Sequence, residues 1–375
     1  MANFRAIVCT AILGLILVGC KHSDDSIVVG CMAPFTGEAA TYGRSTRRGV
    51  ELAVEQINAR KFLSKPLTVD FEDDRMEPRE GLNAFHKLVD IDHVPVILGP
   101  FGSSVVMSCA PLANSSKTVI ITASATADQI ADAGDYVFRI VPPNSKQGFD
   151  LAEFSIHKLG AKRAAILYQT NDYGMTLRDS FTSTFQKEGG AILRSEGYPL
   201  GAVDYRAALT HIKPLKPDVI FFPLHQKEAA LMLRQAKELG ISSAFISADG
   251  AYTNDLISAA GGAAENTYFS TMALAFGVAD DQIKSFQQAF REKFGEDPDV
   301  YAAYYYELTN LLAQVIRNSG SNNEAIRQGL VSMTGNNAYH GITGETSFDS
   351  KGEVNKNFYI YQVRNGRFEL VGPPL

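Results

Sequence analysis

Hydroxyl side chains and one carboxylate follow three apolar runs of the sequence. Ser103 and Ser104 come after PVILGP (95–100), Ser124 and Thr126 lie at the end of TVIITAS (118–124) and just beyond it, and Asp249 closes AFISAD (244–249). A hydroxyl-rich loop that leads into a helix offers O–H and N–H donors to a carboxylate. A lone acid after an apolar strand offers acceptors to an ammonium group. These residue types predict binding chemistry rather than bond-breaking chemistry.

Each of these residues also has a purely structural interpretation. Ser103 and Ser104 are good helix caps, and Asp249 with Gly250 is common turn chemistry. The three tyrosines Tyr42, Tyr173 and Tyr301 would ordinarily pack in the core, and the alternative is that they line a pocket. Taken alone, the residue types leave these alternatives open.

The motifs of catalysis and of nucleotide binding are missing. No GxGxxG, GxSxG or HExxH occurs, and GEAATYGRS has five residues between its glycines and Arg44 where a phosphate-binding loop has lysine. The seven histidines are scattered, and Asp73 and Asp74, adjacent at a strand end, point to opposite sides. We therefore expect no enzyme activity, no cofactor and no metal site.

Apolar strand-like runs alternate with helical patterns along the chain, as in 43–60, where Val50, Val54 and Ile57 recur at helical spacing. Strands that are apolar throughout are buried on both faces, which is typical of parallel sheets covered by helices. The strand-like runs are 26–33, 66–72, 95–100, 118–124, 163–169, 218–224 and 244–249. They predict an α/β fold with two Rossmann-like lobes, each with a parallel central sheet, joined by a hinge of several strands.

The predicted lobes are discontinuous in sequence. One series of strands ends near Arg139 and the next begins near Ser145, with VPPNS (141–145) as a hinge candidate, and a helical pair (280–294 and 299–318) fits neither series. FYIYQVRNGRFELVG, with its Asn365-Gly366 turn, predicts a β-hairpin. We expect lobe 1 to comprise 26–143 plus 274–345, and lobe 2 to comprise 144–273 plus 346–375.

The first nineteen residues have the anatomy of an export signal: Arg5, an apolar run too short to span a bilayer, and small residues before Cys20. LVGC (17–20) resembles the lipobox of bacterial lipoproteins, which implies that residues 1–19 are a signal peptide, Cys20 is lipidated, and 20–25 is a tether. Lys21 leaves the outer membrane open as a destination. Loss of Arg5 takes the net charge from -6 to -7, and no basic tract suggests nucleic acid. Cys31 and Cys109 remain, so at most one disulfide can form.

The order of these pieces resembles the leucine/isoleucine/valine-binding protein family, the type I periplasmic binding proteins (Venus-flytrap fold) of amino-acid ABC transporters. The similarity runs through the whole mature chain. The segments that carry it are IVVGCMAPFTGEAATYGRSTRRGVELAVEQINA, VDFEDDRMEP, VPVILGPFGSS, ITASATADQI, VFRIVPPNSKQG, NDYGM and FISADGAY.

The resemblance implies roles for individual residues. Ser103 and Thr126 would hold the carboxylate of an amino acid, while Asp249 and the carbonyl of Ser124 would hold its ammonium group. Aromatic or polar side chains would wall the pocket: Phe101, Tyr42, Tyr173, His225 and Tyr301. For Tyr301, packing in the helix core is an equal alternative.

This chain departs from the family pattern at several positions. Met76 and Gly102 stand where family members often have a disulfide. Phe101 is bulkier than an aliphatic residue, and His225 adds a polar, pH-sensitive group. These departures leave the choice among amino acids open.

The resemblance implies a lipid-anchored, exported binding protein, periplasmic or on the cell surface, that closes two lobes around an amino acid and delivers it to an ABC permease with its ATPase subunits. The alternatives are a ligand sensor of the same fold and a binding protein for amides, urea or aromatic carboxylates. Asp249 disfavours the latter, because those ligands carry no ammonium group.

Overall fold

The computed structural model describes residues 26–272 and 281–372. The predicted signal peptide, Cys20 and the tether lie outside the described residues, as does the expected boundary between 273 and 274. Within the described residues, no helix combines the length and the apolar character needed to cross a bilayer.

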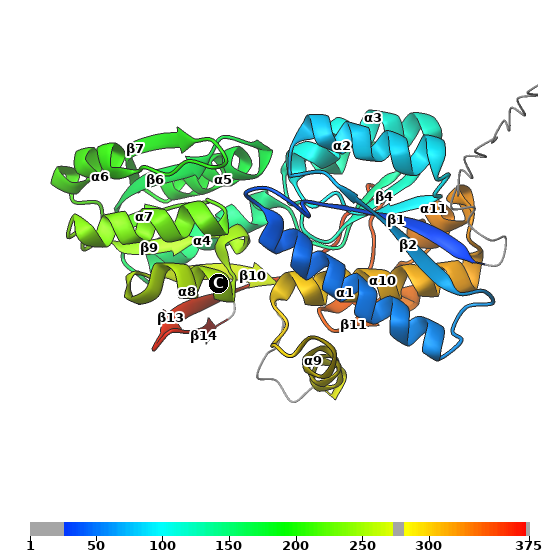
Figure 1. Ribbon diagram of the computed structural model, residues 1–375. Helices are drawn as coiled ribbons and strands as arrows, with labels where there is room; N and C mark the ends of the chain where they lie inside the picture. Colours follow the sequence, from blue (N-terminus) through cyan, green and yellow to red (C-terminus); the bar gives the residue numbers. More distant parts are fainter. Residues whose placement is uncertain (1–25, 273–280, 373–375) are drawn as a thin grey trace, which may run out of the picture.

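The protein consists of two α/β lobes that lie side by side, with a central sheet in each (Figure 1). The sheet of the first lobe has the order β2-β1-β3-β4-β5, and all its strands are parallel. Its strands are β1 (Ile27–Ala33), β2 (Leu67–Asp73), β3 (Val96–Leu98), β4 (Val119–Thr122) and β5 (Val137–Arg139). The predicted fold class is confirmed.

The sheet of the second lobe has the order β14-β13-β10-β9-β8-β6-β7. Strands β6 to β10 are parallel, whereas β13 and β14 form an antiparallel hairpin at one edge. The strands are β6 (Arg163–Gln169), β7 (Ala191–Tyr198), β8 (Val219–Phe221), β9 (Ala244–Ser247), β10 (Tyr268–Met272), β13 (Phe358–Arg364) and β14 (Arg367–Gly372). The hairpin predicted around Asn365-Gly366 is confirmed.

Alternating side chains of the first sheet bury against helices on both faces. Cys31 belongs to the core beneath α1 and α10, whereas its neighbour Met32 belongs to the core beneath α2 and α3. Helices α9 and α11 lie beside α1 and α10. The helices of this lobe are α1 (Ala40–Ala59), α2 (Pro78–His86), α3 (Ser103–Ser116), α9 (Asp281–Phe294), α10 (Val300–Ser319) and α11 (Asn323–Val331), with a short ladder of β11 (Tyr339–Gly341) and β12 (Gly344–Thr346).

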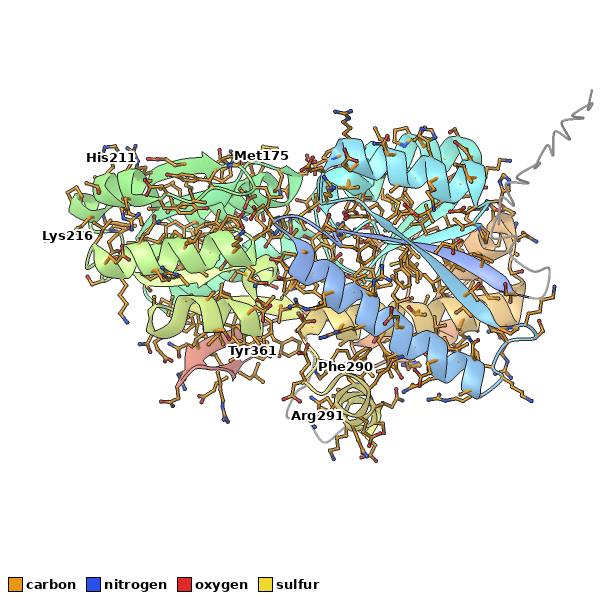
Figure 2. The ribbon with its side chains drawn as sticks, in the orientation of Figure 1. Met175, His211, Lys216, Phe290, Arg291 and Tyr361 are labelled. Atoms are coloured by element: carbon orange, nitrogen blue, oxygen red, sulfur yellow. The ribbon has the colours of Figure 1, made fainter. Side chains whose placement is uncertain are left out.

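Helix α1 approaches α10 closely at Gly49. A Cβ at this position would lie 2.1 Å from the carbonyl oxygen of Ala302, so only glycine fits. Helix α9 has one buried face, with Phe290 on it, and one exposed face, with Arg291 on it (Figure 2). The pair of helices that matched neither strand series therefore completes the first lobe.

The second sheet is covered in the same way. Helices α4 and α5 share a core with one face, and α6, α7 and α8 pack on the other. These helices are α4 (Asn144–His157), α5 (Asp172–Lys187), α6 (Arg206–Ile212), α7 (Gln226–Glu238) and α8 (Asn254–Ala260).

The chain passes between the lobes more than once. It leaves the first sheet through residues 140–143, which we call the first crossing, and it returns to the second sheet through residues 347–357, which we call the final crossing. A further passage falls between Met272 and Asp281, outside the described residues. Cys31 and Cys109 are both buried and free, so the disulfide that the sequence left open is not formed.

Candidate ligand-binding site

A cavity of about 260 Å³ lies between the lobes, at the carboxyl ends of their strands. It is lined by residues that follow β2, β3, β4, β6, β7, β8 and β9 and by the start of α10. The lining residues are Met76, Pro78, Phe101, Gly102, Ser103, Ser104, Val105, Ser124, Thr170, Asn171, Tyr173, Pro199, Leu200, His225, Asp249, Gly250 and Tyr301. Seven of the nine predicted site residues are among them; Tyr42 and Thr126 are not.

The first lobe contributes a hydroxyl wall, formed by Ser103 and Ser124. Ser103 opens α3, and its Oγ accepts hydrogen bonds from the backbone N–H groups of Thr126 and Ala127, both at 3.2 Å. A hydroxyl oxygen has two lone pairs and one hydrogen, so the Ser103 hydroxyl has only its hydrogen left to offer, and no described residue accepts it. The helix-capping role open from the sequence is not what Ser103 does, since no side chain caps α3.

Ser124 holds the adjoining part of the hydroxyl wall. Its Oγ donates to the carbonyl of Phe101 at 2.9 Å and lies 3.0 Å from the hydroxyl of Tyr305. These bonds join the loops that follow β3 and β4. Thr126 is fully buried and does not line the cavity; it contributes the N–H group that Ser103 accepts, and its own Oγ1 has no partner among the described residues.

The second lobe contributes an acid wall, formed by Asp249 and Tyr173. Asp249 starts a single 3-10 turn directly after β9, and its Oδ1 accepts from the Tyr173 hydroxyl at 3.2 Å and from the Gly250 N–H at 3.0 Å. Tyr173 lies in the first turn of α5, where the side chain of Asn171 caps the helix by accepting from the Gly174 N–H. Asp249 therefore fills both roles suggested by the sequence, a turn residue and a cavity-lining acid.

The carboxylate of Asp249 is buried without a basic partner. Its exposed fraction is 6%, and no lysine, arginine or histidine forms an ion pair with it within the described residues. Burial raises the pKa of Asp249 to about 6, although hydrogen bonds from Tyr173, Gly250 and Gln147 oppose the rise. A cation that pairs with such a carboxylate is bound favourably, because the pairing offsets the cost of burying an uncompensated charge.

Aromatic rings form the remaining walls. Phe101 stacks on Tyr42 with centroids 4.9 Å apart and meets Tyr301 at 5.0 Å. Tyr301 is buried, lines the cavity and donates to the carbonyl of Asp249 at 2.9 Å. Tyr301 therefore fills both of the roles that the sequence offered as alternatives: it lines the pocket, and it packs in the helix core.

His225 is a rigid wall of the cavity. Its ring stacks on Tyr173 at 5.1 Å, and the amide nitrogen of Asn171 donates to its Nε2 at 3.3 Å. Burial lowers the pKa of His225 to about 4, so the imidazole is neutral near pH 7. The pH sensitivity expected from the sequence therefore falls well below pH 7, because burial disfavours the charged ring.

Met76 and Gly102 lie next to each other beside the cavity. A Cβ at residue 102 would lie 2.9 Å from Cγ of Met76, so the methionine side chain fills the space that a larger residue would need. The two positions that the resemblance associates with a disulfide are thus close in space and joined by packing.

Hydrogen bonds between the lobes close the cavity. The Tyr42 hydroxyl donates to the carbonyl of Gly250 at 2.5 Å and accepts from the Gln226 N–H at 2.7 Å. Ser104 donates to the carboxylate of Asp172 at 2.6 Å. These contacts join residues far apart in sequence, so no local pattern could have predicted them, although Thr170 and Asn171 could have been found as the polar pair that ends an apolar strand.

One of the histidines lies beside two glutamates on the surface. Glu153, His157 and Glu188 each offer a ligand atom, and these atoms lie within 4.8 Å of one another. The group lies on α4 and just after α5 and shares no residue with the cavity.

Two lobes with a cavity between them that is lined by binding groups, and by no paired nucleophile and base among the described residues, are the arrangement expected of a solute-binding protein of the hinged type. The sequence matches the model of the periplasmic binding protein family over residues 26–367, and the chain belongs to that family. The resemblance drawn from the sequence is confirmed. This is a family of exported proteins that bind solutes, and it is not a class of enzymes.

Individual relatives span nearly the whole chain. An amino acid binding protein of Pseudomonas aeruginosa is 27% identical over 360 residues, which are 95% of this chain and 93% of the relative. The crystal structure of the leucine binding protein LivK from Thermotoga maritima has a TM-score of 0.87 at 26% identity and covers 93% of this chain and 98% of its own. The branched-chain amino acid transporter substrate binding protein LivJ from Streptococcus pneumoniae, in complex with isoleucine, has a TM-score of 0.86 at 28% identity and covers 93% and 100%.

Proposed function

We propose that the protein captures a free amino acid between its lobes and delivers it to the permease and ATPase subunits of an ABC importer. The observation that carries the proposal is Asp249, a buried carboxylate that lines the cavity and has no basic partner among the described residues. An α-ammonium group is the ligand feature that would neutralise it. The names of the relatives, which include leucine and isoleucine binding proteins, agree with this ligand class.

The negatively charged carboxylate of the ligand would have partners of its own. The Ser103 hydroxyl, with both lone pairs used by backbone N–H groups, can act toward a ligand only as a donor. A carboxylate is the strongest acceptor that an amino acid can bring to it. Burying a zwitterion is favourable only if both charges are paired, and the hydroxyl and acid walls each supply one partner. The carbonyl of Ser124 adds an acceptor for the ammonium group, whereas Thr126 acts indirectly, through Ser103.

The apolar part of the ligand would lie against the rings of Phe101, Tyr173, His225 and Tyr301. Because His225 is neutral near pH 7 and its Nε2 is bonded to Asn171, this wall is aromatic and carries no charge. Branched-chain and other apolar amino acids fit such a wall better than charged ones.

The test is a thermal-shift and calorimetric screen of the soluble chain, begun after Cys20, against the twenty L-amino acids. Two analogues of L-leucine serve as controls: 4-methylpentanoate, which lacks the ammonium group, and 3-methylbutylamine, which lacks the carboxylate. We expect an apolar L-amino acid to bind and both analogues to bind at least about a hundredfold more weakly. If no amino acid raises the melting temperature, the proposal fails.

Aromatic carboxylates are the second candidate, because four rings line the cavity. They would leave Asp249 without a counterion and add a second negative charge beside it, so we expect benzoate to bind poorly. Tighter binding of benzoate than of every amino acid would reverse this order. A sensing role differs only in the partner, and permease and ATPase genes found next to this gene would favour transport.

Attachment to the membrane through a lipid on Cys20 forms part of the proposal. Labelling with a fatty acid, followed by cell fractionation, tests it. The Cys20→Ala chain should lose the label and move to the soluble fraction; retention of both the label and the membrane location would exclude this anchor.

A further inference from the structure

The loop of residues 126–128 connects the hydroxyl wall to both sides of the first crossing. Its N–H groups at Thr126 and Ala127 bind Ser103 Oγ. Its carbonyl groups face the other way: that of Thr126 accepts from the Asn144 N–H at 2.8 Å, and that of Ala127 accepts from Nη1 of Arg139 at 2.8 Å. The backbone that orients Ser103 is therefore itself held by residues at the two ends of the crossing.

Arg139 is the charged member of this arrangement. It ends β5, is fully buried, and donates through Nε at 2.9 Å and also through Nη2 to Oε2 of Glu353 in the final crossing. Its backbone N–H also donates to the carbonyl of Gly352 at 3.2 Å. One guanidinium thus binds the final crossing with two of its nitrogens and the loop of residues 126–128 with the third.

A buried ion pair is a weak source of stability, because the desolvation of two charges offsets their attraction. Its fixed geometry has a clearer effect: the planar guanidinium sets where the Ala127 carbonyl lies relative to Glu353. The carbonyl that Arg139 holds and the N–H that Ser103 accepts are both attached to the Cα of Ala127. If residue 127 shifted after its carbonyl was released, its N–H would leave Ser103 Oγ, and a lone pair of the serine oxygen would become free.

We propose that Arg139 is a positioning residue of the ligand site, which ties Ala127 through its carbonyl to the final crossing and so keeps the Ser103 hydroxyl a pure donor toward the ligand. The inference rests on the proposed function insofar as Ser103 meets the ligand carboxylate. It adds a route by which movement of the hinge reaches the hydroxyl wall, since the carboxylate that holds Arg139 is on the final crossing, which joins the lobes.

The final crossing contains a second buried ion pair, which serves as a matched control. Lys356 donates to Oε1 of Glu307 at 3.1 Å and to Thr343 at 2.7 Å, and its exposed fraction is 6%. This pair also anchors the crossing to the first lobe. It makes no hydrogen bond to the loop of residues 126–128 among the contacts described.

The experiment compares two neutral pairs of substitutions: Arg139→Gln with Glu353→Gln, and Lys356→Gln with Glu307→Gln. Arg139→Lys is the third variant, because it keeps a charge opposite Glu353 but lacks the planar fork, and it covers the case in which the first pair does not fold. Amide hydrogen exchange at Thr126 and Ala127 is measured by NMR without ligand, and the Kd for L-leucine and L-isoleucine is measured by calorimetry.

In the Arg139 variants we expect the two amides to exchange about tenfold faster or more, and the affinity to fall about tenfold. In the Lys356 pair we expect both quantities to stay within about twofold of the wild type, although its melting temperature falls. Unchanged exchange in every folded Arg139 variant overturns the inference, and so does a loss of affinity equal to that of the Lys356 pair. If the wild type binds no amino acid, the proposed function fails, while the exchange rates still decide whether Arg139 holds the loop.

Discussion

The hydroxyl wall and the acid wall of the cavity are built in opposite ways. Ser103 and Ser124 are uncharged and already hydrogen-bonded to their own lobe. Asp249 carries a charge in a buried site, lacks a basic partner among the described residues, and has a pKa raised to about 6 by burial. The first lobe is therefore prepared before a ligand arrives, whereas the second lobe holds an unfavourable charge that a ligand would relieve.

This difference assigns separate tasks to the two lobes. A wall whose side chains are already ordered loses little conformational entropy when a ligand binds, and it determines how the ligand is oriented. An unsatisfied carboxylate gains the most when the lobes close, because the attraction to a cation grows as water is excluded. We infer that the first lobe selects the pose and that the second lobe supplies most of the pH-dependent and charge-dependent affinity.

The largest expected effect is on the acid wall. Asp249→Asn should weaken binding of the amino acid about a hundredfold or more, because the ligand ammonium group would be buried opposite a neutral amide. Calorimetry at pH 7.5 measures the change. Asp74→Asn is the matched control, since Asp74 is a fully buried acid of the first lobe that does not line the cavity; equal losses in both variants would remove the distinction between the walls.

A smaller effect is expected on the hydroxyl wall. Ser103→Ala should lower the affinity about tenfold to a hundredfold, the range for a hydrogen bond to a charged group, and should leave the pH profile unchanged. Ser108→Ala is the control, because this serine lies one turn further along α3 and donates to the carbonyl of Ser104. A change in the pH profile of Ser103→Ala would show that the walls are coupled.

The pH dependence sharpens the comparison further. Since a bound ammonium group favours the ionised form of Asp249, affinity should be constant above pH 7 and fall as pH drops through about 6, by about tenfold per unit below it. Binding at pH 5.5 should release protons, visible as calorimetric heats that depend on the ionisation enthalpy of the buffer. The Asp249→Asn protein should show neither effect, and a wild-type affinity that is flat from pH 5 to 8 would exclude the ammonium role.

The variant with the smallest expected effect on binding changes stability instead. Burial raises the pKa of Asp74 to about 7, above its value of 3.8 in an exposed state. The native state then binds more protons than the unfolded state between these values, so the stability due to this group is greatest at low pH and declines as pH rises through 7. Asp74→Asn should raise the free energy of unfolding by roughly 2–4 kcal/mol at pH 8, since each unit of the raised pKa corresponds to about 1.4 kcal/mol, and by less at pH 5, as measured by urea denaturation. A decrease at pH 8 would mean that the carboxylate is satisfied in its ionised form.

The architecture was largely predictable because buried parallel strands are apolar throughout. All seven strand-like runs contain strands, but β7 was missed, since it lies at the edge of its sheet and alternates partly exposed residues such as Arg194 and Glu196. β5 and β10 were also not predicted as strands; β5 has only three residues.

The site was predictable where it depends on position at a strand end, as for Ser103 and Asp249. It was not predictable where it depends on contacts between distant segments. The burial of Thr126, the neutral state of His225 and the bond from Arg139 to the Ala127 carbonyl all arise from groups brought together only by the fold. The roles of these residues toward a ligand stay predictions.

The position of the β13–β14 hairpin has a consequence for how the chain acquires its structure. The hairpin pairs with β10 (Tyr268–Met272), far earlier in the chain, and α10 covers a sheet whose strands are complete by Arg139. Neither lobe can therefore finish its core until the last hundred or so residues are present, since these contacts are distant in sequence. A chain that emerges N-terminus first therefore cannot complete either core until its end has emerged. This delay favours the unfolded state that passage through a membrane pore requires.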